Sequence, residues 1–360
     1  MIKFEDGISA QLYKNLINLS KTKDLRYLNE AIRLCGIEPD PAYQQYVDMM
    51  EEVAQGGKLV LYGFGQNAKK YYELEQQRKG TVGYLYVPFF GEVSWHAIGD
   101  RKPQNIEMLY PHIPKYTWER MIAEDDDKTI YYIATPDYYD EIKNDMIDAG
   151  IPEARIKKYL YINTICYENK QYFDDFLTPL NEEIVIDGGC FRCDSLERFI
   201  QWNKEYGYKK VISFEPDKRN YEICHDIIEN KQWFNVELVN AGLSDHNMEI
   251  GIVSNGDDTT YLTEDECENK ITTVGIDAFL GDYEEKVSFI KLDVEGFELK
   301  TLQGAAQTIR KNHPRMAISL YHKDEDLYEI PAFIQSISDD YRFYLRMYSN
   351  AYLEIVLYAV

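Results

Sequence analysis

One stretch of the sequence, EEIVIDGGCFRCDS at residues 182–195, restricts the fold of this chain most strongly. An apolar, β-branched run at residues 184–186 ends at an acid and two glycines, residues 187–189, and the polar residues 194–195 then open an amphipathic segment. This order is typical of a buried parallel strand that turns tightly into a helix. Because the glycines let a ligand approach the backbone and the helix start offers free N–H groups, the stretch predicts a nucleotide-like ligand at the carboxyl edge of a sheet.

A second acidic position follows the next apolar run along the chain. Residues 211–214 form this run, and Glu215, Pro216 and Asp217 come directly after it. An acid at the tip of the second strand of a βαβ unit can accept hydrogen bonds from both hydroxyls of an adenosine ribose. No lysine follows the glycines in the way that a P-loop requires, so the expected ligand is not a nucleoside triphosphate.

The charge of the chain argues against several classes of partner. Net charge is −23, with 62 acidic and 39 basic side chains, which opposes binding to nucleic acids and to anionic membrane surfaces. No apolar run approaches the roughly 20 residues that a membrane-spanning helix needs, and the first residues, MIKFEDG, are acidic where a signal peptide is basic. We therefore expect a cytoplasmic protein without nucleic-acid partners or membrane insertion.

The 360 residues divide into four segments by their patterns. Residues 1–56 have a helical pattern without a chemical motif, and we expect them to pack on a neighbouring domain or on a second subunit of a homo-oligomer. Residues 57–165 alternate strand and helix as a small Rossmann-like α/β domain. Residues 166–180 connect this domain to the main domain, residues 181–360.

The small domain carries a partial dinucleotide-binding pattern. Gly63, Gly65 and Ala68 follow an apolar strand at the positions of the fingerprint, but Val87 ends the next strand where an acid for the ribose is expected. A Rossmann-like domain with an unknown ligand is therefore preferred to a nicotinamide-binding one. The tract at residues 91–114 is expected to be a long loop.

The main domain continues to alternate between strands and helices. Apolar strands are expected at residues 236–240 and 316–320, each after a helical segment, and at residues 287–292, after an antiparallel-looking run at 248–253 and a polar loop at 254–270. Two closely spaced strands, residues 342–347 and 354–360, end the chain and suggest an antiparallel hairpin on an otherwise parallel sheet. The sequence thus predicts an α/β domain with a seven-stranded sheet.

Six runs of this domain resemble a known family. VIDGG, FEPD, NAGLSD, IKLDVEGFELKTLQGA, SLYHKDEDLYEIP and EIVLYAV occur in this order and resemble the FkbM family of S-adenosylmethionine-dependent methyltransferases. The resemblance covers residues 183–360 and implies a class I methyltransferase domain, and the small Rossmann-like unit resembles the N-terminal domain of many such proteins. Family members methylate hydroxyl oxygens of sugars, polyketides and similar small molecules. The resemblance thus implies S-adenosylmethionine as cofactor and a hydroxyl-bearing substrate, for which a carbohydrate is a guess by analogy.

The resemblance also implies which residues bind the cofactor. Asp187 and Gly189 match the acid and glycine that lie against its methionine part, Glu215 matches the ribose-binding acid, and residues 241–244 match the stretch near the adenine. The complete expected set is Asp187, Gly188, Gly189, Cys190, Phe191, Glu215, Pro216, Asp217, Ala241, Gly242 and Asp293.

The glycine loop departs from the family pattern. Cys193 stands at the usual third glycine, and Phe191 occupies the middle position. Cys190 and Cys193 form a CxxC at a helix start, where a thiolate can be stabilised. No second CxxC or nearby histidine completes a zinc or redox site, so two small buried residues are the preferred interpretation.

Transfer of a methyl group from a sulfonium requires a positioned acceptor and a base. Asp293, Glu295 and His322 are the catalytic candidates, because they follow the expected fourth and fifth strands. His322 is favoured as the base, since imidazole titrates near neutral pH. Asp293 and Glu295 offer the oxygen ligands that a divalent cation prefers, but two carboxylates alone do not support a metal, so none is predicted.

Two other functions remain open at this point. One is a nicotinamide-dependent oxidoreductase that uses the turn after Gly63, against which the missing ribose acid argues. The other is a non-catalytic binding protein that retains the fold.

Overall fold

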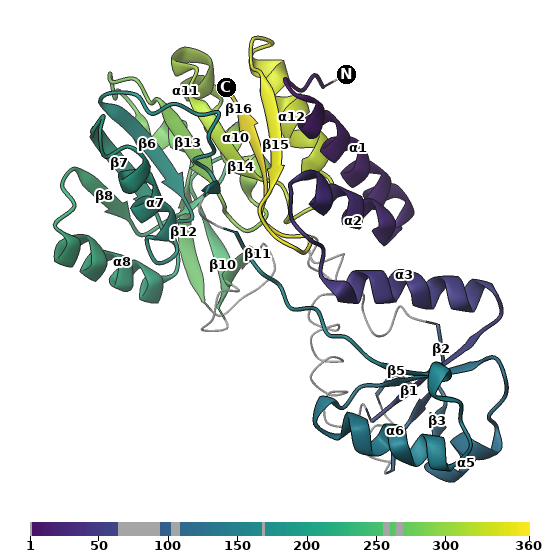
Figure 1. Cartoon of the computed structure of the whole chain (residues 1–360). Helices are drawn as coiled ribbons and strands as arrows, with labels where there is room; N and C mark the ends of the chain where they lie inside the picture. Colours follow the sequence, from purple (N-terminus) through teal and green to yellow (C-terminus); the bar gives the residue numbers. More distant parts are fainter. Residues whose placement is uncertain (1, 64–93, 102–108, 168–169, 255–259, 264–268) are drawn as a thin grey trace.

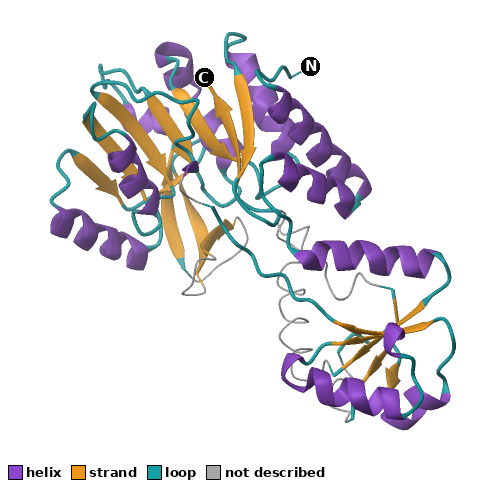
Figure 2. Ribbon diagram, in the orientation of Figure 1, coloured by secondary structure: helices purple, strands orange, loops and turns teal. Residues whose placement is uncertain are grey.

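The computed structural model describes residues 2–63, 94–101, 109–167, 170–254, 260–263 and 269–360. Figures 1 and 2 show a larger body built on a seven-stranded sheet and a smaller body built on a five-stranded sheet. No helix within these ranges is both long and apolar enough to cross a membrane.

The larger body contains the sheet that the glycine stretch begins. Its strands are β6 (Glu183–Gly188), β7 (Tyr208–Phe214), β8 (Val236–Val239), β13 (Phe289–Leu292), β14 (Arg315–Ser319), β15 (Phe343–Met347) and β16 (Ile355–Ala359). They lie in the order β15-β16-β14-β13-β6-β7-β8. Strand β16 runs antiparallel to β14 and β15, which confirms the expected terminal hairpin, and the other pairs are parallel. Because the order reverses between β6 and β13, the carboxyl ends of these strands form a crevice where α/β proteins bind ligands.

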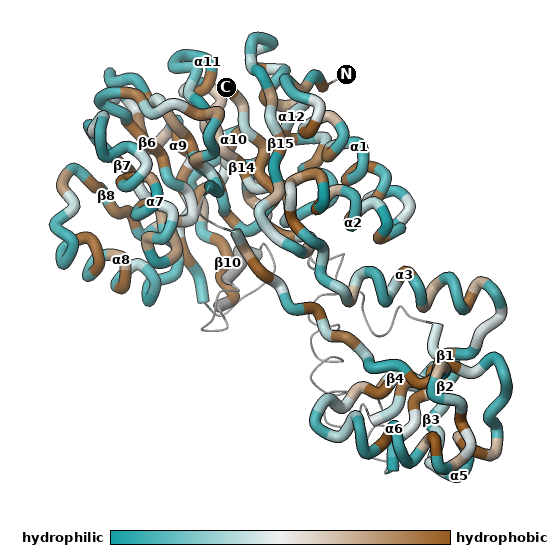
Figure 3. The backbone as a smooth tube through the Cα atoms, viewed as in Figure 1, coloured by the Kyte–Doolittle hydropathy of each residue, from teal (hydrophilic) through white to brown (hydrophobic). Residues whose placement is uncertain are grey.

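Both faces of this sheet are covered, as the continuous apolar run in β6 predicts. Ile184 and Ile186 are buried in one apolar cluster, and Val185 is buried in the other. Figure 3 shows β6 and its neighbours in the sheet as largely hydrophobic segments. The covering helices are α7 (Asp194–Trp202), α8 (Lys218–Lys231), α9 (Ile276–Leu280), α10 (Glu298–Gln303), α11 (Ala306–Asn312) and α12 (Asp326–Ile337).

A second, mostly antiparallel sheet extends the larger body after β8. Its strands are β9 (Gly242–Leu243), β10 (Met248–Ser254), β11 (Thr260–Thr263) and β12 (Lys270–Val274), in the order β11-β10-β12-β9. Strand β9 directly follows the turn at the end of β8, so the extension begins at the crevice.

The N-terminal helices do not form a separate unit. Helices α1 (Gly7–Thr22) and α2 (Leu25–Leu34) contribute fully buried leucines to the same apolar cluster as Phe343 of β15. The backbone N–H of Glu5 donates to the carbonyl of Phe343 at 3.0 Å, so the chain start covers the edge strand of the sheet. Helix α3 (Pro41–Ala54) leads to the smaller body, where Met49 is buried.

The smaller body is a parallel α/β unit, as its pattern predicts. Its strands are β1 (Lys58–Tyr62), β2 (Trp95–Gly99), β3 (Lys115–Tyr116), β4 (Thr129–Ile133) and β5 (Ile156–Lys158), in the order β3-β2-β1-β4-β5, with helices α5 (Trp118–Ala123) and α6 (Tyr139–Asp148). The interpretation of residues 91–114 as a loop was wrong, because β2 lies there and pairs with β1. Its alternating Trp95, Ala97 and Gly99 are a strand pattern too short to distinguish from a loop. The fingerprint positions after Gly63, and the expected strand that ends at Val87, lie outside the described residues.

The connecting segment belongs to the core of the larger body. Tyr172, Phe173 and Leu177 are buried in one of the apolar clusters that cover the large sheet. Residues 170–180 therefore pack on the sheet before β6 begins, and this places Tyr172 at the crevice.

Candidate active site

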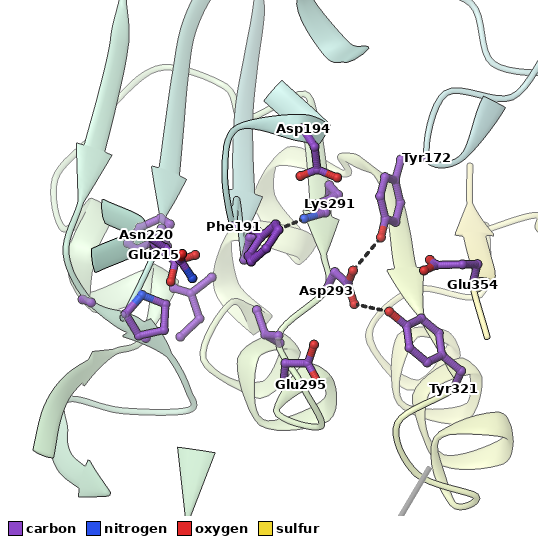
Figure 4. A pocket seen from close by; sticks show the side chains of 17 residues that line it. Tyr172, Phe191, Asp194, Glu215, Asn220, Lys291, Asp293, Glu295, Tyr321 and Glu354 are labelled. Atoms are coloured by element: carbon purple, nitrogen blue, oxygen red, sulfur yellow. Dashed lines mark hydrogen bonds between the residues drawn. The ribbon is translucent and has the colours of Figure 1, made fainter. Parts of the chain in front are cut away.

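A cavity of about 250 Å³ lies at the carboxyl ends of β6, β7 and β13 (Figure 4). Eight of the expected site residues line it: Gly189, Phe191, Glu215, Pro216, Ala241, Gly242, Asp293 and Glu295. Glu215 and the two carboxylates that follow β13 thus face one space, whereas Asp187, which was expected to contact the same ligand, does not line it.

The glycine bend joins the ends of three strands. The N–H groups of Gly189 and Cys190 both donate to the carbonyl of Phe214 at 3.1 Å, which ties the end of β6 to the end of β7. Gly189 has φ +75°, and a Cβ atom there would lie 1.8 Å from the carbonyl oxygen of Asp293. Only glycine fits, because the bend packs directly on the backbone that follows β13.

Asp187 supports this bend from behind. Its carboxylate accepts hydrogen bonds from Ser195 at 3.0 Å and Ser213 at 3.2 Å, and lies 3.3 Å from Nζ of Lys291. Nζ in turn donates to the carbonyls of Gly188 at 3.1 Å and Gly189 at 2.6 Å. Burial alone would lower the pKa of Lys291, but the charge of Asp187 raises it above its usual value. Lys291 therefore stays charged beneath the bend and also lines the cavity.

Glu215 is a buried carboxylate at the opposite end of the cavity. Its side chain is 4% exposed, and it accepts a hydrogen bond from the N–H of Asp217 at 2.9 Å. Burial raises the pKa of Glu215 to about 8, although this hydrogen bond opposes the shift. Asn220 lies beside it in Figure 4, and Pro216 also lines the cavity. A buried acceptor with apolar neighbours is suited to bind hydroxyl donors of a ligand.

Asp293 is held by two tyrosines. Its Oδ2 accepts from the hydroxyl of Tyr172 at 2.7 Å, and its Oδ1 accepts from Tyr321 at 3.1 Å (Figure 4). Burial would raise the pKa of Asp293, but the charges of His322 and Lys291 and the Tyr172 hydroxyl hold it below its usual value. Asp293 is thus a fixed, ionised carboxylate at the cavity wall.

His322 lies behind this wall, outside the cavity lining formed by the described residues. Its ring is 7% exposed, and Nδ1 lies 2.9 Å from Oε1 of Glu298. Nε2 lies 3.4 Å from Oε2 of Glu295 and 3.6 Å from Oδ1 of Asp293. Burial would lower the pKa of His322, but Glu298 and Glu295 raise it well above its usual value.

Three further expected residues, among those described, lie away from the lining. Gly188 packs within the sheet, where a Cβ atom would lie 2.8 Å from Leu243. Asp217 caps helix α8 by accepting from the N–H of Asn220 at 2.9 Å. Cys190 is buried, with its Sγ 3.8 Å from Sγ of Cys224. Like Asp187, these residues support the segments that line the cavity but do not line it themselves.

Sequence reasoning missed several lining residues. Tyr172 comes from the connecting segment, Asn220 from α8, and Glu354 from the turn before β16. Tyr172 is one of 31 tyrosines and belongs to no motif, so no sequence pattern distinguishes it from the others. No binding role was predicted for Lys291 from the sequence, although a lysine within a buried strand is itself an unusual feature.

Comparisons with known proteins identify similar sequences and folds. Residues 190–344 match the family model described as Methyltransferase FkbM domain. The solved structure of methyltransferase FkbM from Methylobacillus flagellatus KT is 17% identical and covers 98% of this chain and 99% of that chain, with a TM-score of 0.54. SMU.1697c, a putative methyltransferase from Streptococcus mutans in complex with SAH, is 11% identical and covers 51% of this chain and 91% of that chain, with a TM-score of 0.32. A search of curated protein sequences finds no relative. The first structure shows that the α/β fold is shared over nearly the whole of both chains.

Proposed function

We propose that this protein transfers a methyl group from S-adenosylmethionine to a hydroxyl oxygen of a small molecule, because residues 190–344 match the family model described as Methyltransferase FkbM domain. The observation that carries the proposal is the shared cavity. Glu215 faces it from the tip of β7, and Gly189 and Asp293 face it from the ends of β6 and β13.

The cofactor extends along this cavity in the proposed complex. Glu215 accepts hydrogen bonds from the two ribose hydroxyls, and the adenine lies against Ala241 and Gly242. The methionine part lies at the glycine bend beside Lys291, whose positive charge attracts its carboxylate. Phe191 lies near the sulfonium, where an aromatic ring adds cation–π attraction.

The transfer step needs little beyond position and a proton acceptor. The acceptor oxygen attacks the methyl carbon, the carbon–sulfur bond breaks, and S-adenosylhomocysteine leaves with the electron pair of that bond. Holding the two reactants in line contributes at most ~7 to 11 kcal/mol. The hydroxyl proton passes to Glu295, whose carboxylate lines the cavity, whereas both oxygens of Asp293 already accept hydrogen bonds from tyrosines. A base of this kind contributes about 10²- to 10⁴-fold.

The acidic wall indicates the class of acceptor. Asp293, Glu295 and Glu354 all line the cavity, so a phosphorylated acceptor would be repelled. Tyr172 and Tyr321 lie on the same side and provide aromatic surface of the kind that contacts sugars. We therefore propose a neutral, hydroxyl-bearing substrate such as a carbohydrate.

Calorimetry with purified protein tests the proposal. We expect S-adenosylmethionine and S-adenosylhomocysteine to bind one per chain and NADH not to bind. Glu215→Ala should abolish binding of both ligands. Glu222→Ala, an exposed position on helix α8, should leave their binding unchanged. Binding of NADH alone would contradict the proposal. A panel of sugar acceptors with labelled methyl donor then identifies the substrate.

A further inference from the structure

We infer that His322 is a positioning residue for the methyl transfer: its charged imidazole holds Glu295 and Asp293 at the cavity wall and does not itself take the proton of the substrate. This role rests on the proposed function, in which Glu295 accepts that proton. The contacts of His322 with the two carboxylates need no ligand, so they exist in the empty protein as well.

The loop after β14 fastens the loop after β13. The hydroxyl of Tyr321 donates to Oδ1 of Asp293 at 3.1 Å, and Nζ of Lys323 donates to the carbonyl of Gly296. His322 stands between these two donors in the sequence, and its ring centroid lies 4.1 Å from that of Tyr321. The imidazole therefore faces the same loop as its two neighbours.

The ring of His322 is anchored at Nδ1. This atom lies 2.9 Å from Oε1 of Glu298, and that same oxygen accepts from the N–H of Val294 at 2.9 Å. Glu298 is completely buried, so the anchor is rigid and shielded from water. A ring fixed at one nitrogen points its other nitrogen in a defined direction.

Nε2 of His322 points at the two carboxylates of the cavity wall. It lies 3.4 Å from Oε2 of Glu295 and 3.6 Å from Oδ1 of Asp293, and it has no hydrogen-bond partner among the described residues although its atom is buried. The ring charge therefore attracts both carboxylates at short range without donating its proton to either.

Glu295 depends on this attraction more than Asp293 does. Two tyrosines already hold Asp293, whereas the side chain of Glu295 is 36% accessible. The backbone of Glu295 also has φ +54°, a conformation that a residue with a side chain keeps only where its surroundings enforce it. The imidazole is thus a fixed counter-charge for the less restrained of the two carboxylates.

The carboxylates around the ring keep it charged. Burial would lower the pKa of His322, but Glu298, Glu295 and Asp293 raise it well above its usual value. A general base must be neutral before it accepts a proton, and His322 is not among the described residues that line the cavity. Glu295 does line it, so His322 acts through Glu295. The other titratable groups of this cluster are Lys291, Lys323, Glu325 and Asp326.

The imidazole also sets how readily Glu295 ionises. Burial raises the pKa of Glu295 to about 7, while the charge of His322 opposes a larger rise. A base whose pKa lies near the working pH is both ionised and able to hold a proton. Without the ring charge, Asp293 and Glu298 would keep Glu295 protonated at neutral pH.

A nuclear magnetic resonance titration of the full chain without ligands tests this contact. With ¹³C at the side-chain carboxyl of glutamate, the Glu295 signal is the one that disappears in Glu295→Gln. In the unmodified chain it should titrate near pH 7. In His322→Asn an amide nitrogen replaces Nδ1 beside Glu298 but carries no charge. The midpoint of Glu295 should therefore rise by about 1 to 3 pH units, the usual effect of one nearby charge.

His225→Asn is the matched control. The exposed His225 of α8 also lies near two carboxylates, 3.9 Å from Asp226 and 3.7 Å from Glu229. The midpoint of Glu295 should stay the same in this variant. If His322→Asn does not fold, ¹⁵N spectra of the His322 ring in the unmodified chain decide. A ring protonated on both nitrogens at about pH 7.5 supports the inference, and a neutral ring overturns it.

Binding of two nucleosides tests the effect on the cavity. Sinefungin has an ammonium-bearing carbon in place of the methylated sulfur of S-adenosylmethionine, and in the proposed complex this ammonium faces Glu295. His322→Asn should lower the preference for sinefungin over S-adenosylhomocysteine at least about threefold near pH 7.5, because less of the Glu295 carboxylate is ionised. Equal weakening of both ligands would indicate a structural role alone and overturn the inference.

The outcomes separate this role from the proposed function. An unchanged midpoint of Glu295 in His322→Asn overturns the inference even if S-adenosylhomocysteine binds. A raised midpoint without binding of either nucleoside would refute the proposed function alone, because His322 acts on Glu295 without a ligand.

Discussion

At the scale of single residues, the site contains a buried carboxylate, Glu215, whose ionised form is disfavoured by its burial. Glu215 is almost fully buried, yet its proposed role requires an ionised acceptor. Burial raises its pKa to about 8, so at neutral pH the empty site holds a proton that the unfolded chain releases. The folded protein therefore loses stability as pH rises from the unfolded pKa, near 4.3, through 8.

Glu215→Gln should stabilise the cofactor-free protein and weaken cofactor binding. Above pH 8 we expect a gain of about 2 to 4 kcal/mol in unfolding free energy relative to the unmodified chain, shrinking toward zero at pH 5. Binding of S-adenosylhomocysteine should weaken by ~10- to 100-fold, because a charged acceptor becomes neutral. Urea denaturation between pH 5 and 9 measures the first effect and calorimetry the second. Stability curves that run parallel across this range would mean that Glu215 is already ionised.

At the scale of secondary-structure elements, the helices α1 and α2 form part of the large domain. They cover β15, the edge strand of the sheet, and the isolated bridge between Phe4 and Phe343 extends this cover. A sequence pattern shows which face of a helix is apolar, but not which distant strand it covers. The segment of residues 1–56 was therefore predicted to be helical without a defined partner.

Leu16→Ala in α1 should destabilise the larger body. Leu16 is fully buried in the cluster that contains Phe343, so we expect a loss of about 2 to 5 kcal/mol in unfolding free energy. Lys14→Ala, on the exposed face of the same helix, should change stability by no more than about 0.5 kcal/mol. In a urea titration, binding of S-adenosylhomocysteine serves as the probe of folding. It distinguishes unfolding of the larger body from unfolding of the helix alone. An unchanged binding midpoint would show that α1 unfolds independently.

The same limit explains how much of the site was predictable. Gly189 after β6 and Glu215 after β7 were expected at the cavity because strand ends in parallel sheets meet at one edge, but Asp187 and Gly188 lie behind its wall. Tyr172 and Glu354 reach the cavity through tertiary packing, which no local pattern records. Gly189 was expected to admit a ligand, whereas its close approach to the backbone of Asp293 gives a second requirement for glycine.

At the scale of the whole molecule, a small set of hydrogen bonds joins the two bodies. Asp40 caps α3 by accepting from the N–H of Ala42 at 2.8 Å and also accepts from the N–H of Asn163 at 2.9 Å. The amide of Asn350 donates to the carbonyl of Asn163 at 3.1 Å. The chain passes between the bodies twice, near Asp40 and near Asn163. These hydrogen bonds link the two passages to each other and to Asn350 in the turn before β16.

Asp40→Ala should therefore cost more than the loss of a helix cap. We expect a decrease of about 2 to 4 kcal/mol in unfolding free energy, because a cap is lost and the N–H of Asn163 loses its acceptor. Asp24→Ala removes the cap of α2, where Asp24 accepts from Arg26 at 3.0 Å, and should cost about 1 kcal/mol. Scanning calorimetry of both variants compares the losses. Equal losses would indicate that the bond to Asn163 contributes nothing to stability.

The segment that matches the family model, residues 190–344, is smaller than the larger body of the structure. Strand β6, strand β16 and Tyr172, which donates a hydrogen bond to Asp293, all lie outside this segment. Expressing the segment alone would remove two strands from the sheet and one hydrogen-bond donor from the cavity wall. A shortened version of the protein should therefore begin before Tyr172 and retain β16.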